Sequence, residues 1–170
     1  MQRTRDKRRV TGSRKLTHFT DEGAARMVDV SAKGETLREA VAAARVTMQP
    51  ATLRLILDRK VSKGDVLGVA RVAGIMAAKR TPELIPMCHP LNLSSVEIDL
   101  TPDRKTSSIA ITATVRIFGR TGVEMEALTA AAAAGLTVYD MCKSADRAMT
   151  VTDVRLLRKS GGKSGTFERK

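Results

Sequence analysis

The segment LIPMCHPLNLS, residues 84–94, places Cys88 directly beside His89 and between two prolines. A Cys-His pair can bind a metal ion, act as a nucleophile with its base, form a ligand-binding turn, or simply pack. Zinc needs three or four Cys, His or carboxylate ligands at short spacings, and the chain has two cysteines and two histidines. Neighbouring residues of an extended segment also point in opposite directions. Of the four interpretations, the metal site is therefore the weakest.

Asp140 and Lys143 are three residues apart in a segment with a helical pattern, so their side chains share one face. On an exposed helix such a pair is usually an ordinary ion pair that contributes little stability. In a cleft the same pair can transfer protons, because each charge changes the pKa of the other group. The residues alone leave both interpretations open.

Two glutamates, Glu124 and Glu126, lie near the start of the same segment. Thr121 precedes Glu124 by three residues, the spacing of a capping box, and carboxylates suit the first turn of a helix. Two carboxylates near one site can instead serve as acid and base. Lys63, in SKGD, is by itself an ordinary loop lysine. The sequence thus contains several groups that could transfer protons, without showing that they meet.

The segment SGGKSG, residues 160–165, is similar to a phosphate-binding loop, in which glycine amides and a lysine hold phosphate oxygens. It does not fit the Walker pattern, because the first glycine would fall at Leu157 and only six residues follow Ser164. We expect a flexible end of the chain. Lys159 and Lys163 can still offer positive charge to an anion.

The chain has 170 residues, which predicts one domain with a sizeable core. Aromatic residues make up only 2% of the chain against 42% hydrophobic residues, so Leu, Val, Ile, Met and Ala must form the core. Small side chains bury less apolar area each. Burial of further surface between subunits would compensate, and we therefore expect an oligomer.

Half of the net charge of +12 lies in residues 1–15, which contain seven basic residues and one acidic residue. We predict that these residues are a disordered basic tail and that residues 16–170 form the single domain. The charge also suggests an alternative function, a nucleic-acid-binding module that uses the tail on phosphates. Such a module needs aromatic residues for base stacking, and the chain has no Trp, one Tyr and three Phe. Nucleic-acid binding is therefore the weaker hypothesis.

The chain shows no export signal and no apolar run of membrane-spanning length, and it has two cysteines. This pattern is typical of a reducing compartment. We expect a cytoplasmic protein without a disulfide and without membrane association.

Apolar periodicity predicts the elements of the first half. We expect a strand at 27–31 and a second at 36–48. Pro50 opens a helix that includes residues 51–60, and residues 63–80 form another helix. Its apolar stripe consists of Val66, Val69, Ala70, Ala73, Met76 and Ala77.

The second half predicts a β-hairpin, because residues 94–100 and 108–118 alternate apolar and polar side chains around a polar turn. A long alanine-rich helix over residues 120–149 and a strand over 150–159 follow. The order of elements predicts an α+β, ferredoxin-like fold, with an antiparallel sheet and helices packed on one face.

Four segments read together resemble the MoaC family of molybdenum cofactor biosynthesis, the cyclic pyranopterin monophosphate synthases. They are RMVDVSAK, KGDVLGVARVAGIMAAKRTPELIPMCHPL, TGVEMEALTAAAAAGLTVYDMCK and VRLLRKSGGKSG. The resemblance covers roughly residues 16–166. Long ordered segments are far more specific than a short motif.

The resemblance implies a homohexamer, a trimer of dimers with active sites at the dimer interface. It implies that (8S)-3',8-cyclo-7,8-dihydroguanosine 5'-triphosphate, supplied by a radical-SAM GTP cyclase, is converted to cyclic pyranopterin monophosphate with release of diphosphate. We expect no metal site and no cofactor in the protein. Mg²⁺ could still arrive bound to the triphosphate of the substrate. The iron–sulfur chemistry would belong to the cyclase, since two cysteines cannot supply four thiolates.

The resemblance also implies the site residues. The catalytic residues are Asp140, Lys63 and Lys143. The substrate-binding residues are Met87, Cys88, His89, Met125, Glu126, Glu124, Arg38, Asp29 and Lys159. It thus favours a ligand-binding turn at Cys88-His89. We expect Lys63 and Lys143 to act as acid-base groups, with Asp140 holding Lys143, and Arg38 and Lys159 to contact the triphosphate.

Overall fold

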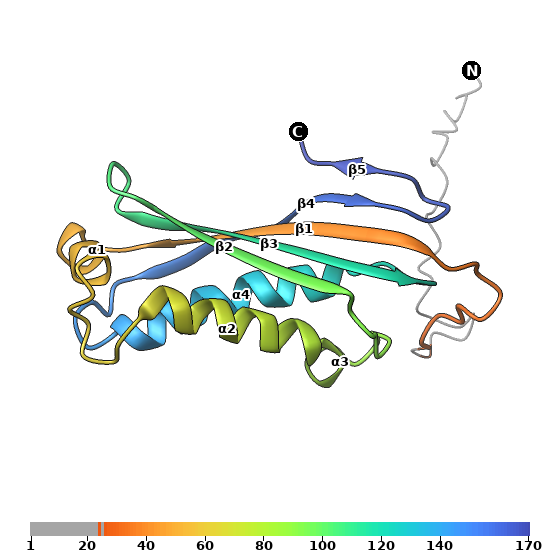
Figure 1. Ribbon diagram of the computed structural model, residues 1–170, viewed down its shortest axis with the longest axis horizontal. Coiled ribbons are helices and arrows are strands. Elements are labelled where there is room, and N and C mark those ends of the chain that lie inside the picture. The colour runs from red at the N-terminus through yellow and green to blue at the C-terminus, as the bar shows by residue number, and fades with distance from the viewer. Residues whose placement is uncertain (1–23, 25) are drawn as a thin grey trace, which may run out of the picture.

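Helices cover one face of a twisted, five-stranded antiparallel sheet in the computed structural model (Figure 1). The structure describes Ala24 and residues 26–170. The predicted basic tail, residues 1–15, and the predicted start of the domain at residue 16 lie outside the described residues.

The spatial order of the strands is β2-β3-β1-β4-β5, and every neighbouring pair is antiparallel. The first four strands form two β-α-β halves, with β5 added at one edge. This order confirms the predicted ferredoxin-like α+β fold. The strands are β1 Thr36–Thr47, β2 Ser95–Asp103, β3 Ser108–Gly119, β4 Thr150–Ser160 and β5 Phe167–Glu168.

Two long helices, α2 (Val66–Lys79) and α4 (Glu124–Cys142), run side by side beneath the sheet (Figure 1). The short helices α1 (Pro50–Leu57) and α3 (Thr81–Leu84) lie near opposite ends of α2. Asp65 caps α2, since its carboxylate accepts a hydrogen bond from the Gly68 amide at 3.0 Å. Pro50 occupies the first turn of α1, as predicted.

The core is built from small side chains. Ala40, Ala42, Ala44 and Val46 of β1 point to the helices and are buried, whereas Leu37 points away and is 66% exposed. On α2 the buried residues are Val66, Ala70, Gly74 and Ala78. The predicted stripe was therefore partly wrong: Val69 and Met76 are exposed, because the helix turns Gly74 toward α4. A β-carbon at Gly74 would lie only 3.0 Å from the Ala130 carbonyl oxygen, so glycine permits this close approach.

The opposite face of the sheet carries a row of alternating charge. Arg116 donates from Nε to Glu39 and from Nη1 to Glu97, each at 2.6 Å. Arg158 donates to the other oxygen of Glu39, also at 2.6 Å. The four side chains come from β2, β3, β1 and β4, so the row crosses four neighbouring strands.

Three local predictions were wrong. Residues 27–31 form no strand; the Val28 carbonyl oxygen bonds the His89 ring instead of a neighbouring strand. Thr121 and Glu124 form no capping box, because α4 begins at Glu124 without a side-chain cap and Glu124 pairs with Lys159. The same helix ends at Cys142 rather than at residue 149. Beyond it the chain forms a turn, in which the Asp146 carboxylate accepts a hydrogen bond from the Ala148 amide.

Candidate active site

A cavity of about 460 Å³ lies at the N-terminal end of α4. Seven of the predicted substrate-binding residues line it. They are Met87, Cys88, His89, Glu124, Met125, Glu126 and Lys159. Three separate segments of the chain, the turn after α3, the start of α4 and the end of β4, therefore meet at one place.

The Cys88-His89 turn is fixed by backbone contacts. The Cys88 amide donates to the Ile85 carbonyl at 3.0 Å, and His89 Nε2 lies 2.9 Å from the Val28 carbonyl oxygen. Burial, with the nearby Glu126 charge, raises the pKa of the Cys88 thiol, so the thiol is not an activated nucleophile. Among residues 26–170 no group of three or more Cys, His, Asp or Glu could hold a metal ion. The turn therefore forms part of the cavity wall, and its role in ligand binding stays a prediction.

Glu126 is the most deeply buried charged group of this cavity, with 3% of its surface exposed. Burial, with a smaller contribution from the neighbouring Glu124 charge, raises the pKa of Glu126 to about 7. A carboxyl with such a pKa is partly protonated at neutral pH. It can therefore either donate or accept a proton.

Glu124, by contrast, has a cationic partner: Lys159 Nζ donates to Glu124 Oε1 at 2.8 Å. Both side chains also line a smaller adjoining cavity of about 200 Å³, together with Arg38. Arg38 Nε donates to the Gly119 carbonyl oxygen at 2.9 Å, which orients the guanidinium group. Asp29 lines neither cavity; its exposed carboxylate accepts from the Ser31 amide at 2.8 Å, and this bond lowers its pKa.

The predicted catalytic residues form a separate cluster. The two carboxylate oxygens of Asp140 bind two ammonium groups, Lys63 Nζ at 2.9 Å and Lys143 Nζ at 2.6 Å. Lys143 and then Lys63 lower the pKa of Asp140 to about 2, and Asp140 raises the pKa of Lys143. The spacing of Asp140 and Lys143 predicted the contact between these two residues, which the structure contains. The contact with Lys63, which lies in the loop between α1 and α2, could not be predicted from spacing.

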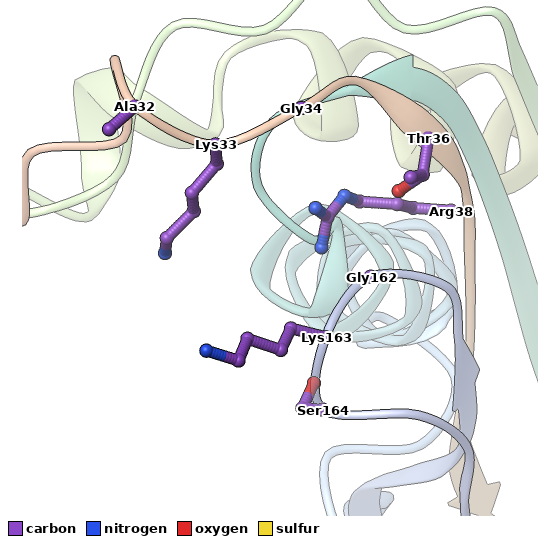
Figure 2. Close-up of a pocket in the computed structure, with 8 residues that line it drawn as sticks. All are labelled: Ala32, Lys33, Gly34, Thr36, Arg38, Gly162, Lys163 and Ser164. Atoms are coloured by element: carbon purple, nitrogen blue, oxygen red, sulfur yellow. The ribbon is translucent and has the colours of Figure 1, made fainter.

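The cavity and the catalytic cluster lie at opposite ends of α4. Glu126 and Asp140 are fourteen residues apart on this helix, which corresponds to roughly 21 Å at about 1.5 Å per residue. A single chain therefore brings the predicted residues together in two groups. Sequence reasoning missed Lys33, which lines this cavity, the smaller one of about 200 Å³, and a third of about 810 Å³ (Figure 2). It lies within RMVDVSAK, so the segment was recognised but the side chain was not.

Residues 27–162 match the sequence profile of the MoaC family. The chain belongs to the MoaC family. A relative from Rhodospirillum rubrum, named cyclic pyranopterin monophosphate synthase, is 64% identical over 152 residues, which cover 89% of this chain and 92% of the relative. Relatives with the same name from Parvibaculum lavamentivorans and Pelotomaculum thermopropionicum are 58% and 61% identical. The alignments cover 93% and 91% of this chain, and 99% and 91% of the relatives.

Membership of the MoaC family confirms the resemblance predicted from the sequence, and it favours an enzyme over the nucleic-acid-binding alternative. Within the described part of this MoaC chain, no helix has both the length and the apolar character needed to cross a membrane.

Proposed function

We propose that this MoaC chain converts (8S)-3',8-cyclo-7,8-dihydroguanosine 5'-triphosphate to cyclic pyranopterin monophosphate and diphosphate, an early step of molybdenum cofactor biosynthesis. The names of the relatives support this activity. The structural observation that supports it most is the buried Glu126, whose pKa is raised to about 7, in a cavity that adjoins a smaller one lined by four cations and two carboxylates. Rearranging the substrate requires proton transfer, and releasing diphosphate requires positive charge.

The proposed site is shared between two subunits. Lys63, Asp140 and Lys143 are half exposed in the single chain and lie far from Glu126. A second copy that docks this cluster over the cavity would complete the site. Exposed apolar side chains offer surface for such contacts; they are Val69, Val72, Met76 and Leu136. We propose the homohexamer, a trimer of dimers with sites at the dimer interface.

In the proposed reaction the rearrangement of base and sugar needs protons moved on and off nitrogen and oxygen. Glu126 and the ammonium groups of Lys63 and Lys143 are the groups suited to this, with Asp140 as the fixed anion that orients both lysines. In the cyclisation, a substrate hydroxyl oxygen bonds to the α-phosphorus and its proton passes to a base of the site. The bond from the α-phosphorus to the bridging oxygen breaks, and diphosphate leaves. Arg38 and Lys159 would stabilise the charge on the departing phosphates.

We propose that the protein holds no resident metal and that any Mg²⁺ arrives bound to the triphosphate. The substrate would come from a radical-SAM GTP cyclase, which supplies the iron–sulfur chemistry. A cytoplasmic location remains our prediction from the sequence.

The proposal is tested by incubating the purified protein with the cyclised triphosphate and following the cyclic product and diphosphate by mass spectrometry. Wild-type protein should form both in equal amounts. Lys63→Ala and Asp140→Ala should form neither, while gel filtration shows an unchanged assembly. Absence of turnover in the wild type contradicts the proposed function, and wild-type turnover in either variant contradicts the role of that residue.

A further inference from the structure

Asp146 is, with Glu126, one of two charged side chains among the described residues that are almost fully buried, with 3% of its surface exposed. It lies four residues beyond the end of α4, and its own amide donates to the Cys142 carbonyl oxygen of that helix at 3.0 Å. The proposed reaction does not use its carboxylate. Asp146 is nevertheless attached directly to the helix end that carries Asp140.

The Asp146 carboxylate binds the start of α1. Its Oδ2 atom accepts from the Gln49 amide at 2.8 Å and from the Thr52 hydroxyl at 3.3 Å, and its Oδ1 atom accepts from the Ala148 amide. Helix α1 has no side-chain cap and no acidic residue in its own first turn. A carboxylate 97 residues away from Gln49 in the sequence therefore supplies the negative charge that the N-terminus of a helix favours.

The other end of α1 leads to Lys63 through a short connection with defined turns. Arg59, two residues after the helix, has a φ of +53°, the left-handed conformation that commonly ends a helix. The Gly64 amide donates to the Val61 carbonyl oxygen at 3.0 Å, which closes a turn that contains Lys63. The Lys63 ammonium group then donates to both the backbone carbonyl and the carboxylate of Asp140, each at 2.9 Å.

Helix α1 and the loop that follows it are thus attached to the end of α4 at two points. Asp146 holds the start of the helix, and Lys63 holds the end of the loop. Cys142 lies near both points: burial raises the pKa of its thiol, the Asp146 charge raises this pKa further, and the Lys63 charge opposes the rise. Two charges from opposite ends of the α1 unit therefore act on one buried sulfur atom.

We propose that Asp146 is a positioning residue, which keeps the loop after α1 where Lys63 meets Asp140. Without its carboxylate, α1 is anchored by the buried apolar side chains Leu53 and Ile56, whose contacts are not directional. The loop then shifts more easily and Lys63 leaves Asp140 more often. The acid-base role of Lys63 rests on the proposed function, whereas the placement of its ammonium group by Asp146 does not.

The reactivity of the Lys63 amine in the folded, full-length protein tests this placement without a substrate. The protein is labelled briefly with an acetylating reagent, and mass spectrometry of its peptides gives the rate at each lysine. Asp146→Asn leaves a single acceptor oxygen and should raise the Lys63 rate about fivefold, the size expected for one lost hydrogen bond. Lys159 is the internal reference, because it forms a similar ion pair with Glu124 at the other end of α4.

A substitution at Thr52 tests the same contact while Asp146 stays in place. Thr52→Val keeps the shape of the side chain but removes the hydroxyl donor, and should raise the Lys63 rate about twofold. Thr52→Ser keeps the hydroxyl and is the matched control, with the wild-type rate expected. This pair decides the question if Asp146→Asn does not fold. Unchanged Lys63 labelling in the folded variants, or an equal rise at Lys63 and Lys159 that reports general loosening, overturns the proposal.

Turnover of the cyclised triphosphate separates this inference from the proposed function. Asp146→Asn should lower kcat about fivefold and change KM less than about twofold, because its hydrogen-bond partners lie outside the substrate cavity. Wild-type kcat despite faster Lys63 labelling would overturn the positioning role. Faster Lys63 labelling in a protein that shows no turnover even as wild type would support the placement and contradict the proposed function.

Discussion

The Lys63 ammonium group lies 2.9 Å from the Asp140 carboxylate, although 77 residues separate them in the sequence. Lys143 Nζ lies 2.6 Å from the other carboxylate oxygen of Asp140. With a pKa lowered to about 2, Asp140 stays ionised at every pH at which the protein would work. In the single chain Asp140 is therefore an anion that holds two ammonium groups in place.

Asp140→Asn should abolish most activity without unfolding the protein. The amide keeps the shape of the side chain but removes the charge that positions Lys63 and Lys143, so kcat should fall at least about a hundredfold. Product formation from the cyclised triphosphate is the measurement. Asp58→Asn, which weakens the exposed pair with Lys60, is the control and should behave as the wild type. Near-normal turnover by Asp140→Asn would refute the positioning role.

Glu126 should make stability depend on pH between about 4.5 and 7. Its pKa is raised from 4.5 to about 7 in the folded state, so the folded protein binds the proton more tightly. The stability from this group is fully present below pH 4.5 and is lost as the pH rises through 7, by about 3 kcal/mol. Glu126→Gln should therefore raise the free energy of unfolding at pH 8 and change it little at pH 4.5.

Urea denaturation of wild type and Glu126→Gln at both pH values measures this difference. Glu83→Gln, on the exposed surface of α3, is the control and should give the same small effect at each pH. A Glu126→Gln effect that is equal at pH 4.5 and pH 8 would mean that Glu126 carries no raised pKa.

Two inactive variants should restore activity when they assemble together. Lys63→Ala damages the catalytic cluster and Glu126→Gln damages the cavity; if each site joins the two groups from different chains, a mixed dimer contains one intact site. Co-expression with two affinity tags and purification of the mixed hexamers should recover about a quarter of wild-type turnover, since random pairing makes about half of the dimers mixed and each mixed dimer has one intact site of two. If the mixed assemblies stay as inactive as the separate variants, the site is not shared between subunits in this way.

Asp146 should contribute strongly to stability. Its carboxylate is 3% exposed and accepts hydrogen bonds from the Gln49 and Ala148 amides, at 2.8 and 3.0 Å, and from the Thr52 hydroxyl at 3.3 Å. Asp146→Ala leaves the buried Thr52 hydroxyl and the two partly buried amides without this partner, at a cost of about 2–3 kcal/mol in urea denaturation. Asp103→Ala removes similar bonds from an exposed turn and should cost less. Equal losses would contradict a special role for Asp146.

Gly162→Ala should weaken diphosphate binding, because the new methyl group would meet the Arg38 guanidinium group. Gly165→Ala is a matched control: its φ of +66° imposes similar backbone strain, but a β-carbon there meets no atom within 4 Å. Calorimetry should show an affinity loss of about tenfold in Gly162→Ala alone. A loss of the same size in Gly165→Ala would assign the effect to loop strain rather than to Arg38.

The sequence predicted the elements whose patterns are long and locally supported. The alternation that ends in Val115 and Ile117 identified β3, and the alanine-rich run identified α4. Residues 27–31 have a strand-like pattern too, but a strand needs a partner, and the Val28 carbonyl binds His89 instead. The capping-box prediction was wrong because the Glu124 carboxylate pairs with Lys159, a residue distant in the sequence.

The site was only partly predictable from residues. Spacing on one helix could indicate the contact between Asp140 and Lys143, but no local rule places Lys63 beside them, and the family resemblance supplied that residue. The raised pKa of Glu126 depends on burial, which a sequence does not show. Lys33 has no distinguishing pattern of its own, and only the fold brings it beside Lys163.

The charge row across the open face of the sheet has a consequence for how the strands find their alignment. The buried side of β1 is nearly uniform, with three alanines and a valine, so sliding this strand by two residues would fill the core almost as well. The same slide would separate Glu39 from Arg116 and Arg158 at once. The ion pairs of Glu39 therefore favour the observed pairing of β1 over a shifted one, which the alanines of its buried side would tolerate.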